Sequence, residues 1–327
     1  MNQPTRTAAM FVFALLVTLH SAPDAGAQPY PNKSPRLLVG FVPGGGVDIT
    51  GRIIATKLGD MWGQTITVEN RPGAGGTLAG AAAAKAPADG YTFVVCNIGS
   101  HGIAGSLYKS LPYDPVKDVT PVALIGTTPN IMVVHPSVPA TNVAQFIAYA
   151  KANPGKVSFG SSGVGTSTHL GVELFKTMTG VNLVHVPYKG GGQSGVDLVG
   201  GQIQLLITNL PEQLGYVKSG RVRALGVSTA VRTAQLPDVP TIAEAGVPGY
   251  EVTVWYGICG PAGLPREIVQ KVNADTVKLL SSPDTKQLLA VQGVEAAPGT
   301  PEQFAALIQA ETVKWAKVVK DAGVSAD

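Results

Sequence analysis

The chain has 327 residues, of which 45% are hydrophobic, and a formal net charge of +3 at pH 7. This apolar share is enough to fill packed cores and excludes a disordered chain. The 24 Lys and Arg residues are dispersed among 21 Asp and Glu residues. Since nucleic-acid binders cluster their basic residues, the charge argues against a nucleic-acid partner.

The N-terminal segment has the features of an export signal. Arg6 is followed by the apolar run 8–19 and the small residues 25–27, which predicts a signal peptide over residues 1–27, cleaved after Ala27. The apolar run is shorter than the ~20 residues that span a bilayer, and no later stretch stays apolar for that length. No cysteine near the cleavage point could take a lipid. We therefore expect a soluble periplasmic chain without direct membrane insertion.

From Leu37 onward, short apolar runs alternate with helical patterns, which is typical of βαβ units, a mostly parallel sheet and the α/β class. About 300 mature residues exceed the size of one hydrophobic core, so two lobes are expected. Near the C-terminus, Thr300, Pro301 and Gln303 form a capping-box pattern that predicts an amphipathic helix with Trp315 in the core. The expected strands are 36–42, 65–70, 91–96, 131–135, 157–160, 183–186, 203–208, 223–228 and 254–259.

A glycine-rich turn joins the first strand to a helix within 41–58. Its three consecutive glycines, Gly44 to Gly46, let the backbone approach a ligand closely, and the N-terminus of the following helix favours an anion. The sequence therefore predicts a carboxylate cradle. Asp48 has two interpretations, an N-cap that satisfies the helix's own donors or a contact to the ligand, and both can hold together.

A second turn of the same kind occupies 160–169, before the helical stretch 170–178. Its Ser and Thr hydroxyls alternate with glycines. They suit reversible carboxylate binding because uncharged groups bind the anion without forming a strong ion pair. In parallel α/β sheets such turns lie beyond the carboxyl ends of strands, where ligands bind. We expect the two turns to face each other across a cleft; the alternative for the second is a solvated loop.

The motifs of common enzyme classes are missing or weak. Neither turn contains Gly-x-Ser-x-Gly, and the chain has no Gly-x4-Gly-Lys-Ser/Thr. The run Gly190 to Gly195 fits Gly-x-Gly-x-x-Gly, with Glu212 further along the chain. However, residues 187–189 separate the preceding strand from these glycines, and Glu212 follows Pro211 in a turn. Dinucleotide binding is therefore a weak hypothesis.

The histidines and cysteines give no sign of catalysis or of a metal site. Histidines 101, 135, 169 and 185 are scattered, and none stands at ligand spacing from another or from a cysteine. We therefore expect no catalytic residue, no metal and no cofactor. Cys96 and Cys259 each lie in an apolar run and leave two possibilities open, one disulfide or two buried thiols.

Six motifs, found in this order, make the mature chain similar to the periplasmic solute receptors of tripartite tricarboxylate transporters, the Bug family. They are Pro43-Gly44-Gly45-Gly46-Val47-Asp48, Val68-Glu69-Asn70-Arg71-Pro72-Gly73-Ala74-Gly75-Gly76, Asp89-Gly90-Tyr91-Thr92, Leu111-Pro112-Tyr113-Asp114, His185-Val186-Pro187-Tyr188-Lys189-Gly190, and Pro237-Asp238-Val239-Pro240-Thr241 with Glu244.

This resemblance implies a type II periplasmic-binding-protein fold, with two α/β lobes and a ligand cleft between them. Lobe one would combine residues 29–128 and 230–327, and lobe two would be 129–229. The implied function is to capture a small carboxylate-bearing solute and deliver it to the subunits of a membrane transporter, as a monomer and without catalysis. Two rivals stay open, a ligand-sensing subunit of a signalling system and an exported enzyme that uses the same cleft.

The resemblance also implies ligand-binding residues and a kind of ligand. Ala104 and Thr208 stand where many relatives have asparagine and aspartate. Without an acid at position 208, we expect a plain mono- or dicarboxylate, including an aromatic one, rather than an amino acid. The implied site residues are Phe41, Gly45, Gly46 and Asp48 from lobe one, Ser161, Gly165, Thr166 and Ser167 from lobe two, and the flanking Asn97, Ser100, His101, Thr208 and Asn209.

Overall fold

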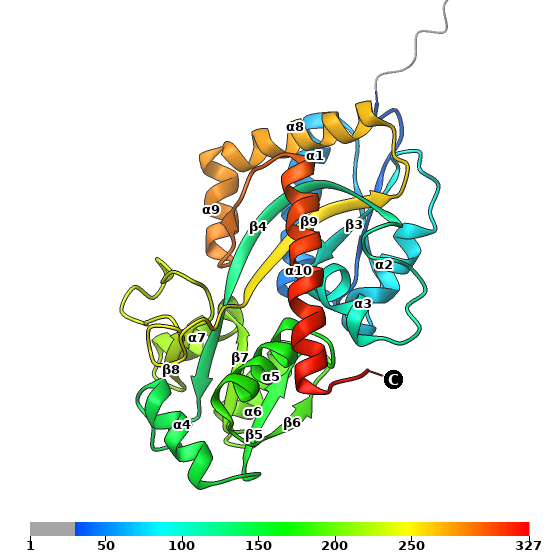
Figure 1. Ribbon diagram of the computed structural model, residues 1–327. Helices are drawn as coiled ribbons and strands as arrows, with labels where there is room; N and C mark the ends of the chain where they lie inside the picture. The colour runs from blue at the N-terminus through cyan, green and yellow to red at the C-terminus, as the bar shows by residue number, and fades with distance from the viewer. Residues whose placement is uncertain (1–29, 327) are drawn as a thin grey trace, which may run out of the picture.

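The computed structural model describes residues 30–326, which form a mixed sheet with helices packed around it (Figure 1). The strands are β1 (Arg36–Val39), β2 (Thr67–Asn70), β3 (Thr92–Asn97), β4 (Val119–Val134), β5 (Val157–Ser161), β6 (Leu183–Pro187), β7 (Leu205–Asn209), β8 (Arg223–Val227), β9 (Thr253–Pro261) and β10 (Glu295–Ala296). The α-helices are α1 (Gly46–Trp62), α2 (Thr77–Ala84), α3 (Ala104–Leu107), α4 (Val143–Ala152), α5 (Ser167–Thr179), α6 (Gly191–Val199), α7 (Leu210–Lys218), α8 (Arg266–Ser281), α9 (Pro283–Val291) and α10 (Pro301–Ala322). A 3-10 turn (Ala74–Gly76) and a π-helix (Ile98–Ile103) complete them.

Two groups of parallel strands are joined by two long antiparallel strands. The order is β2-β1-β3-β9-β4-β7-β5-β6, with β10 and β8 also paired to β4. β1 pairs in parallel with β2 and β3, and β5 does so with β6 and β7. β4 and β9 pair antiparallel with each other and with their neighbours β7 and β3. The expectation of a mostly parallel sheet is therefore wrong at the centre, because β4 and β9 carry the chain between the two groups (Figure 1).

Strand β4 is much longer than the sequence indicates. The apolar run predicts a strand only at 131–135, whereas β4 begins at Val119. Before the predicted run it contains Pro121, Gly126 and Pro129, residues that normally mark turns. The register with β9 shifts between Pro121 and Ala123 and again between Leu124 and Gly126, and such irregularities let a strand accommodate proline and glycine.

The C-terminal helix α10 forms as its capping box predicts. Thr300 accepts a hydrogen bond from the Gln303 N–H at 3.2 Å, and the Gln303 side chain accepts one from the Thr300 N–H at 2.9 Å. Trp315 is fully buried, and its Nε1 donates to Glu311 Oε2 at 2.8 Å. The helix packs on the π-helix and α3, which follow β3, and on α5, which follows β5, so it contacts elements of both groups of strands (Figure 1).

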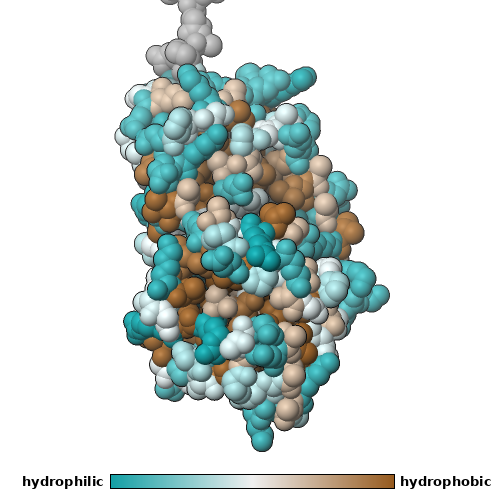
Figure 2. All heavy atoms as spheres, turned by 90° about the vertical axis from the view of Figure 1, so that its left-hand side faces the viewer, coloured by the Kyte–Doolittle hydropathy of each residue, from teal (hydrophilic) through white to brown (hydrophobic). Residues whose placement is uncertain are grey.

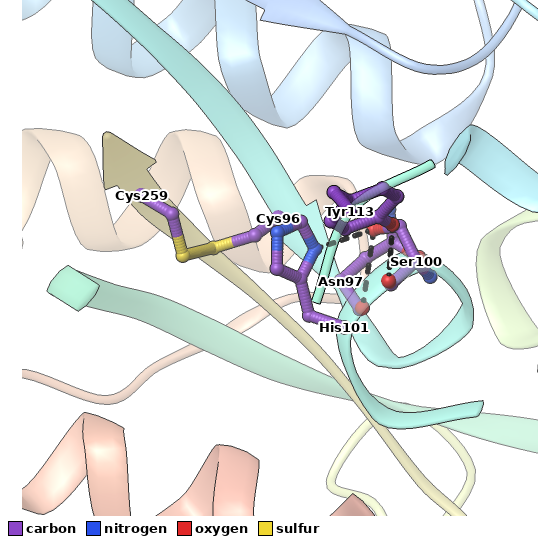
Figure 3. Close-up of a disulfide and its surroundings, with 6 residues drawn as sticks. All are labelled: Cys96, Asn97, Ser100, His101, Tyr113 and Cys259. Carbon is purple, nitrogen blue, oxygen red and sulfur yellow. Dashed lines mark hydrogen bonds between the residues drawn. A yellow bond between two sulfur atoms is a disulfide. The ribbon is translucent and has the colours of Figure 1, made fainter. Parts of the chain in front are cut away.

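Cys96 and Cys259 form a disulfide, which decides between the two possibilities that the sequence leaves open. The bond joins the neighbouring antiparallel strands β3 and β9, both buried along nearly their whole length (Figure 3). Cys96 directly precedes Asn97, the last residue of β3. The disulfide therefore fixes the end of β3 from which the π-helix starts.

The surface mixes hydrophilic and hydrophobic side chains on the face shown in Figure 2. Within residues 30–326, no helix is both long and apolar enough to cross a membrane. The predicted signal peptide and its cleavage after Ala27 lie outside the described residues.

Candidate ligand-binding site

A cavity lies between the two groups of strands and receives residues from both. On one side it is lined by the turn before α1, the start of the π-helix and strand β9. On the other side it is lined by the segments that follow β5, β6 and β7. The lining residues are Phe41, Val42, Gly45, Gly46, Val47, Asn97, Ile98, Gly99, Val254 and Tyr256 on the first side, and Ser162, Thr166, Ser167, Thr168, Lys189, Gly190, Gly191, Asn209 and Glu212 on the second.

Four helices point their N-termini at this cavity. The N-cap residues of α1, α5, α6 and α7 are Gly45, Thr166, Gly190 and Asn209, and each of them lines the cavity. At none of these positions does the side chain accept a hydrogen bond from a backbone N–H group of its helix. The first backbone N–H groups and the positive ends of four helix dipoles therefore face the cavity, an arrangement that attracts an anion.

Polar side-chain atoms without partners line the same cavity. Asn97, drawn beside Ser100 in Figure 3, is 4% exposed. Its Oδ1 accepts hydrogen bonds from the N–H groups of Gly99 at 2.9 Å and Ser100 at 3.3 Å. Within the described residues, the buried atoms Asn97 Nδ2, Ser162 Oγ and Asn209 Oδ1 have no hydrogen-bond partner. Because buried polar groups are nearly always paired, these atoms indicate where a ligand or its bound water completes the hydrogen bonding.

Asp48 stabilises the first turn through hydrogen bonds but does not line the cavity. It is the third residue of α1 and accepts hydrogen bonds from the Gly44 N–H at 2.9 Å, Arg52 Nε at 3.0 Å and Asn70 Nδ2 at 2.8 Å. Burial by itself would raise the pKa of this carboxyl, but these hydrogen bonds lower it overall. The interpretation of Asp48 as the N-cap is wrong, since Gly45 takes that position.

The structure brings seven of the thirteen predicted site residues to the cavity wall, namely Phe41, Gly45, Gly46, Asn97, Thr166, Ser167 and Asn209. Asp48 and the remaining five predicted residues do not line the cavity. Ser161, Thr208, Ser100 and His101 are buried, and the last two hydrogen-bond to each other at 2.8 Å. Gly165 adopts a φ of +80°, and a Cβ there would lie 2.4 Å from Leu107 Cδ2, so the two sides of the molecule touch closely at this glycine.

The predicted ligand site leaves out the third turn, which contributes Lys189, Gly190 and Gly191 to the cavity wall and which the sequence analysis considered only as a weak dinucleotide motif. It follows β6 and opens α6 in the same strand, glycine turn and helix pattern as the other two, so that pattern could have identified it. Glu212, from the first turn of α7, and Tyr256, in the middle of the buried strand β9, also line the cavity. Neither carries a sequence signal that distinguishes it from a turn or core residue.

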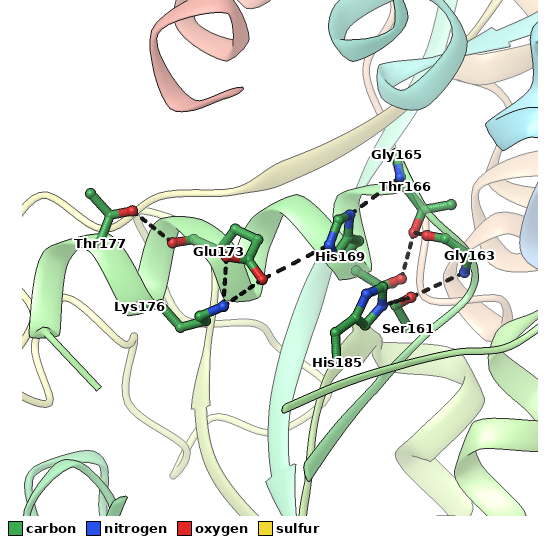
Figure 4. A network of polar contacts seen from close by, with 10 residues as sticks. Ser161, Gly163, Gly165, Thr166, His169, Glu173, Lys176, Thr177 and His185 are labelled. Atoms are coloured by element: carbon green, nitrogen blue, oxygen red, sulfur yellow. Dashed lines mark hydrogen bonds and ion pairs between the residues drawn. The ribbon is translucent and has the colours of Figure 1, made fainter. Parts of the chain in front are cut away.

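A stacked pair of histidines, the buried His169 and the partly buried His185, lies behind the second turn (Figure 4). The rings of His169 and His185 stack with centroids 4.1 Å apart, and His185 Nε2 lies 2.7 Å from Ser161 Oγ. Burial lowers the pKa of His169 from 6.5 to about 3, and the nearby His185 and Lys176 add to the shift. Burial also lowers the pKa of His185 to about 4 and that of His101 to about 3.

Acid is therefore expected to destabilise the folded protein. The unfolded chain binds protons at these histidines below about pH 6.5, whereas the folded protein keeps them neutral down to roughly pH 3 to 4. The stability that these neutral histidines contribute is thus fully present above pH 6.5 and is lost as the pH drops through this window. Each histidine adds a slope of at most about 1.4 kcal/mol per pH unit. Urea unfolding at several pH values measures the slope, which His169→Gln should reduce; an unchanged slope would contradict the assignment.

No metal site accompanies the cavity in the part of the chain that the structure describes, where no three His, Cys, Asp or Glu residues cluster at metal-binding distance. The polar groups on the cavity wall are instead backbone N–H groups, hydroxyls and amides, together with Lys189 and Glu212. Such groups can bind and orient a small anion by hydrogen bonds alone.

The chain is similar to known proteins along most of its length. A family model described as "Tripartite tricarboxylate transporter family receptor" matches residues 50–324. The protein BugT of Bordetella pertussis is 35% identical over 324 residues, which covers 99% of each chain. An R. palustris structure with adipate is 40% identical with a TM-score of 0.86, covering 90% of this chain and 99% of its own. MatC from Rhodopseudomonas palustris with bound malate is 32% identical with a TM-score of 0.82, covering 89% and 100%.

Proposed function

Because the chain belongs to the receptor family of tripartite tricarboxylate transporters, we propose that it captures a small carboxylate-bearing solute and delivers it to the membrane subunits of such a transporter. Its fold is that of the periplasmic binding proteins of this family. The observation that carries the proposal is the convergence of four helix N-termini without side-chain caps on one cavity. Adipate and malate, the ligands of two solved relatives, are dicarboxylates.

The proposed ligand contacts are the predicted residues that reach the cavity wall, together with Ser162. Asp48, Ser100, Ser161 and Thr208 then support the contacting segments from behind. The ligand bridges the turn before α1 and the turn before α5, so it contacts both only when the two sides are close together. Ligand binding would therefore favour closure of lobe one (29–128 and 230–327) on lobe two (129–229). The mature monomer would begin after Ala27 in the periplasm.

A purely binding role is supported by the position of the serine–histidine pair. The hydrogen bond between Ser161 Oγ and His185 has the geometry of a nucleophile and its base. Ser161, however, is fully buried and does not line the cavity. Its hydroxyl also accepts the Gly163 N–H at 3.2 Å. We therefore propose that this pair stabilises the second turn and that the protein binds its ligand without catalysis.

A thermal-shift screen of the mature protein tests the proposal. Carboxylates, neutral sugars and nucleotides are compared at equal concentration, since a ligand of the native state raises its Tm. A selective rise with carboxylates, with the carboxylate recovered unchanged, is the expected result. Stabilisation by nucleotides alone, or consumption of the ligand, would refute it.

Replacing the unpartnered hydroxyl of Ser162 should weaken the binding of the carboxylate found in that screen. The loss of one hydrogen bond to an anion predicts about a tenfold higher Kd for Ser162→Ala. Ser161→Ala, one residue earlier and bonded to His185, should change the Kd by less than about threefold. Isothermal titration calorimetry measures both. The reverse order of effects would show that Ser161, as the resemblance implies, contacts the ligand.

A further inference from the structure

Glu212 places a carboxyl group in a cavity that is otherwise suited to anions. It is the third residue of α7, lines the cavity and is partly exposed to it. Its Oε2 accepts a hydrogen bond from Thr208 Oγ1 at 2.8 Å, and its Oε1 accepts a longer one from Asn209 Nδ2 at 3.5 Å. Among residues 30–326, no Lys, Arg or His forms an ion pair with it. This carboxyl thus has acceptor capacity that the protein does not use.

The carboxyl lies against the start of a second helix. A Cβ built on Gly191, the first residue of α6, would be 1.8 Å from Glu212 Oε2 and 2.4 Å from its Cδ. The group therefore lies beside the N-termini of both α6 and α7, which favour its anionic form. Burial acts in the opposite sense and raises the pKa of Glu212, against the hydrogen bonds from Thr208 and Asn209. The negative charge of Glu212 also adds to the burial that raises the pKa of Tyr256, another residue of the cavity wall.

The cavity wall therefore holds groups that suit two different parts of a ligand. Asn97 Nδ2, an unpartnered donor on a side chain that is 4% exposed, suits a carboxylate oxygen. Glu212 would repel a second carboxylate but accept a hydrogen bond from an O–H or N–H group. Asn209, which also lines the cavity, has an unpartnered acceptor, Oδ1, that could receive a hydrogen bond from the same donor group of the ligand.

We propose that Glu212 accepts a hydrogen bond from a hydroxyl or ammonium group of the ligand, so that the cavity selects hydroxy- or amino-carboxylates over the unsubstituted acids. This inference rests on the proposed function. It changes the expectation of a plain carboxylate, which relied on Thr208 in place of an acid; Thr208 instead holds the carboxyl of Glu212 in the cavity.

The test measures the Kd of six acids by calorimetry on the mature protein at pH 7.5. They form two series of different length, succinate with L-malate and L-aspartate, and glutarate with 2-hydroxyglutarate and L-glutamate. We expect a substituted acid to bind at least tenfold more tightly than its unsubstituted parent in one series. Glu212→Ala should abolish that preference. Glu212→Gln should abolish it for an ammonium, which needs the charge, and largely keep it for a hydroxyl, which needs only an acceptor.

A pair of glycine substitutions controls for effects on folding. Gly191→Ala should displace the Glu212 carboxyl and reduce the preference as Glu212→Ala does, whereas Gly192→Ala, with no atom within 4 Å of the new Cβ, should leave it unchanged. Equal binding of substituted and unsubstituted acids would overturn the role of Glu212 while leaving carboxylate capture intact. Failure of all six acids to bind the folded protein would overturn this inference, whereas the proposed function fails only if no carboxylate raises the Tm in the thermal-shift screen.

Discussion

Asn97→Asp is expected to weaken carboxylate binding by at least about 100-fold, equivalent to about 2.7 kcal/mol, without unfolding the protein. The substitution is nearly isosteric and keeps the Oδ1 acceptor that receives the N–H groups of Gly99 and Ser100. It replaces the unpartnered Nδ2 donor with an oxygen. A charge-assisted hydrogen bond worth about 1.5 to 3 kcal/mol is lost, and a like charge about 4 Å from the ligand adds repulsion of about 4 kcal/mol at an effective dielectric constant near 20.

The measurement is calorimetry at pH 8, at which the introduced acid ionises, with the carboxylate that gives the largest thermal shift. Asn182→Asp adds the same charge at an exposed position before β6 and should leave the Kd within about twofold. An affinity of Asn97→Asp within threefold of the wild type would mean that Asn97 Nδ2 does not face the bound carboxylate.

Trp315→Ala is expected to give the largest loss of stability. Its side chain is fully buried in α10, the helix that packs on the π-helix, α3 and α5. Truncating a buried tryptophan costs about 3 to 5 kcal/mol through lost burial and the cavity left behind. The change also removes the donor to Glu311 Oε2, a carboxyl that is itself buried.

Urea unfolding followed by circular dichroism measures the free energy of unfolding of Trp315→Ala. Val313→Ala lies on the same helix with 68% of its residue surface exposed and should change stability by less than about 0.5 kcal/mol. A loss of unfolding free energy under 1 kcal/mol for Trp315→Ala would contradict this prediction, and so would an equal loss for Val313→Ala. Either result would mean that the packing of α10 does not hold the two groups of strands together.

The residue pattern predicted the structure correctly where interactions between residues close in sequence determine it. The capping box at Thr300 and Gln303 forms, because an N-cap hydrogen bond involves only residues three apart. Glycine turns follow β1, β5 and β6, and helices begin directly after them. A family identified from motifs is confirmed by the family model and by full-length relatives. The predicted site residues that reach the cavity wall come mainly from these turns.

Long-range packing decided the rest. Strand β4 accommodates Pro121 and Gly126 at the points where its register with β9 shifts. The pairing of Cys96 with Cys259 depends on β3 lying beside β9. Asp48 was predicted as cap or ligand contact, but Arg52 and Asn70 hold it behind the turn.

By itself, then, the sequence determined the α/β class, the helix boundaries set by caps, the glycine turns and the family, because each is encoded in neighbouring residues or contiguous motifs. Only the tertiary structure decided which acidic side chain of the protein lines the cavity. Position 208 carries no acid, and Glu212 has the local features of a turn residue. The folding of α7 against Gly191 and Thr208 brings that carboxyl to the wall, since a cavity is formed by segments that meet only when the whole chain has packed.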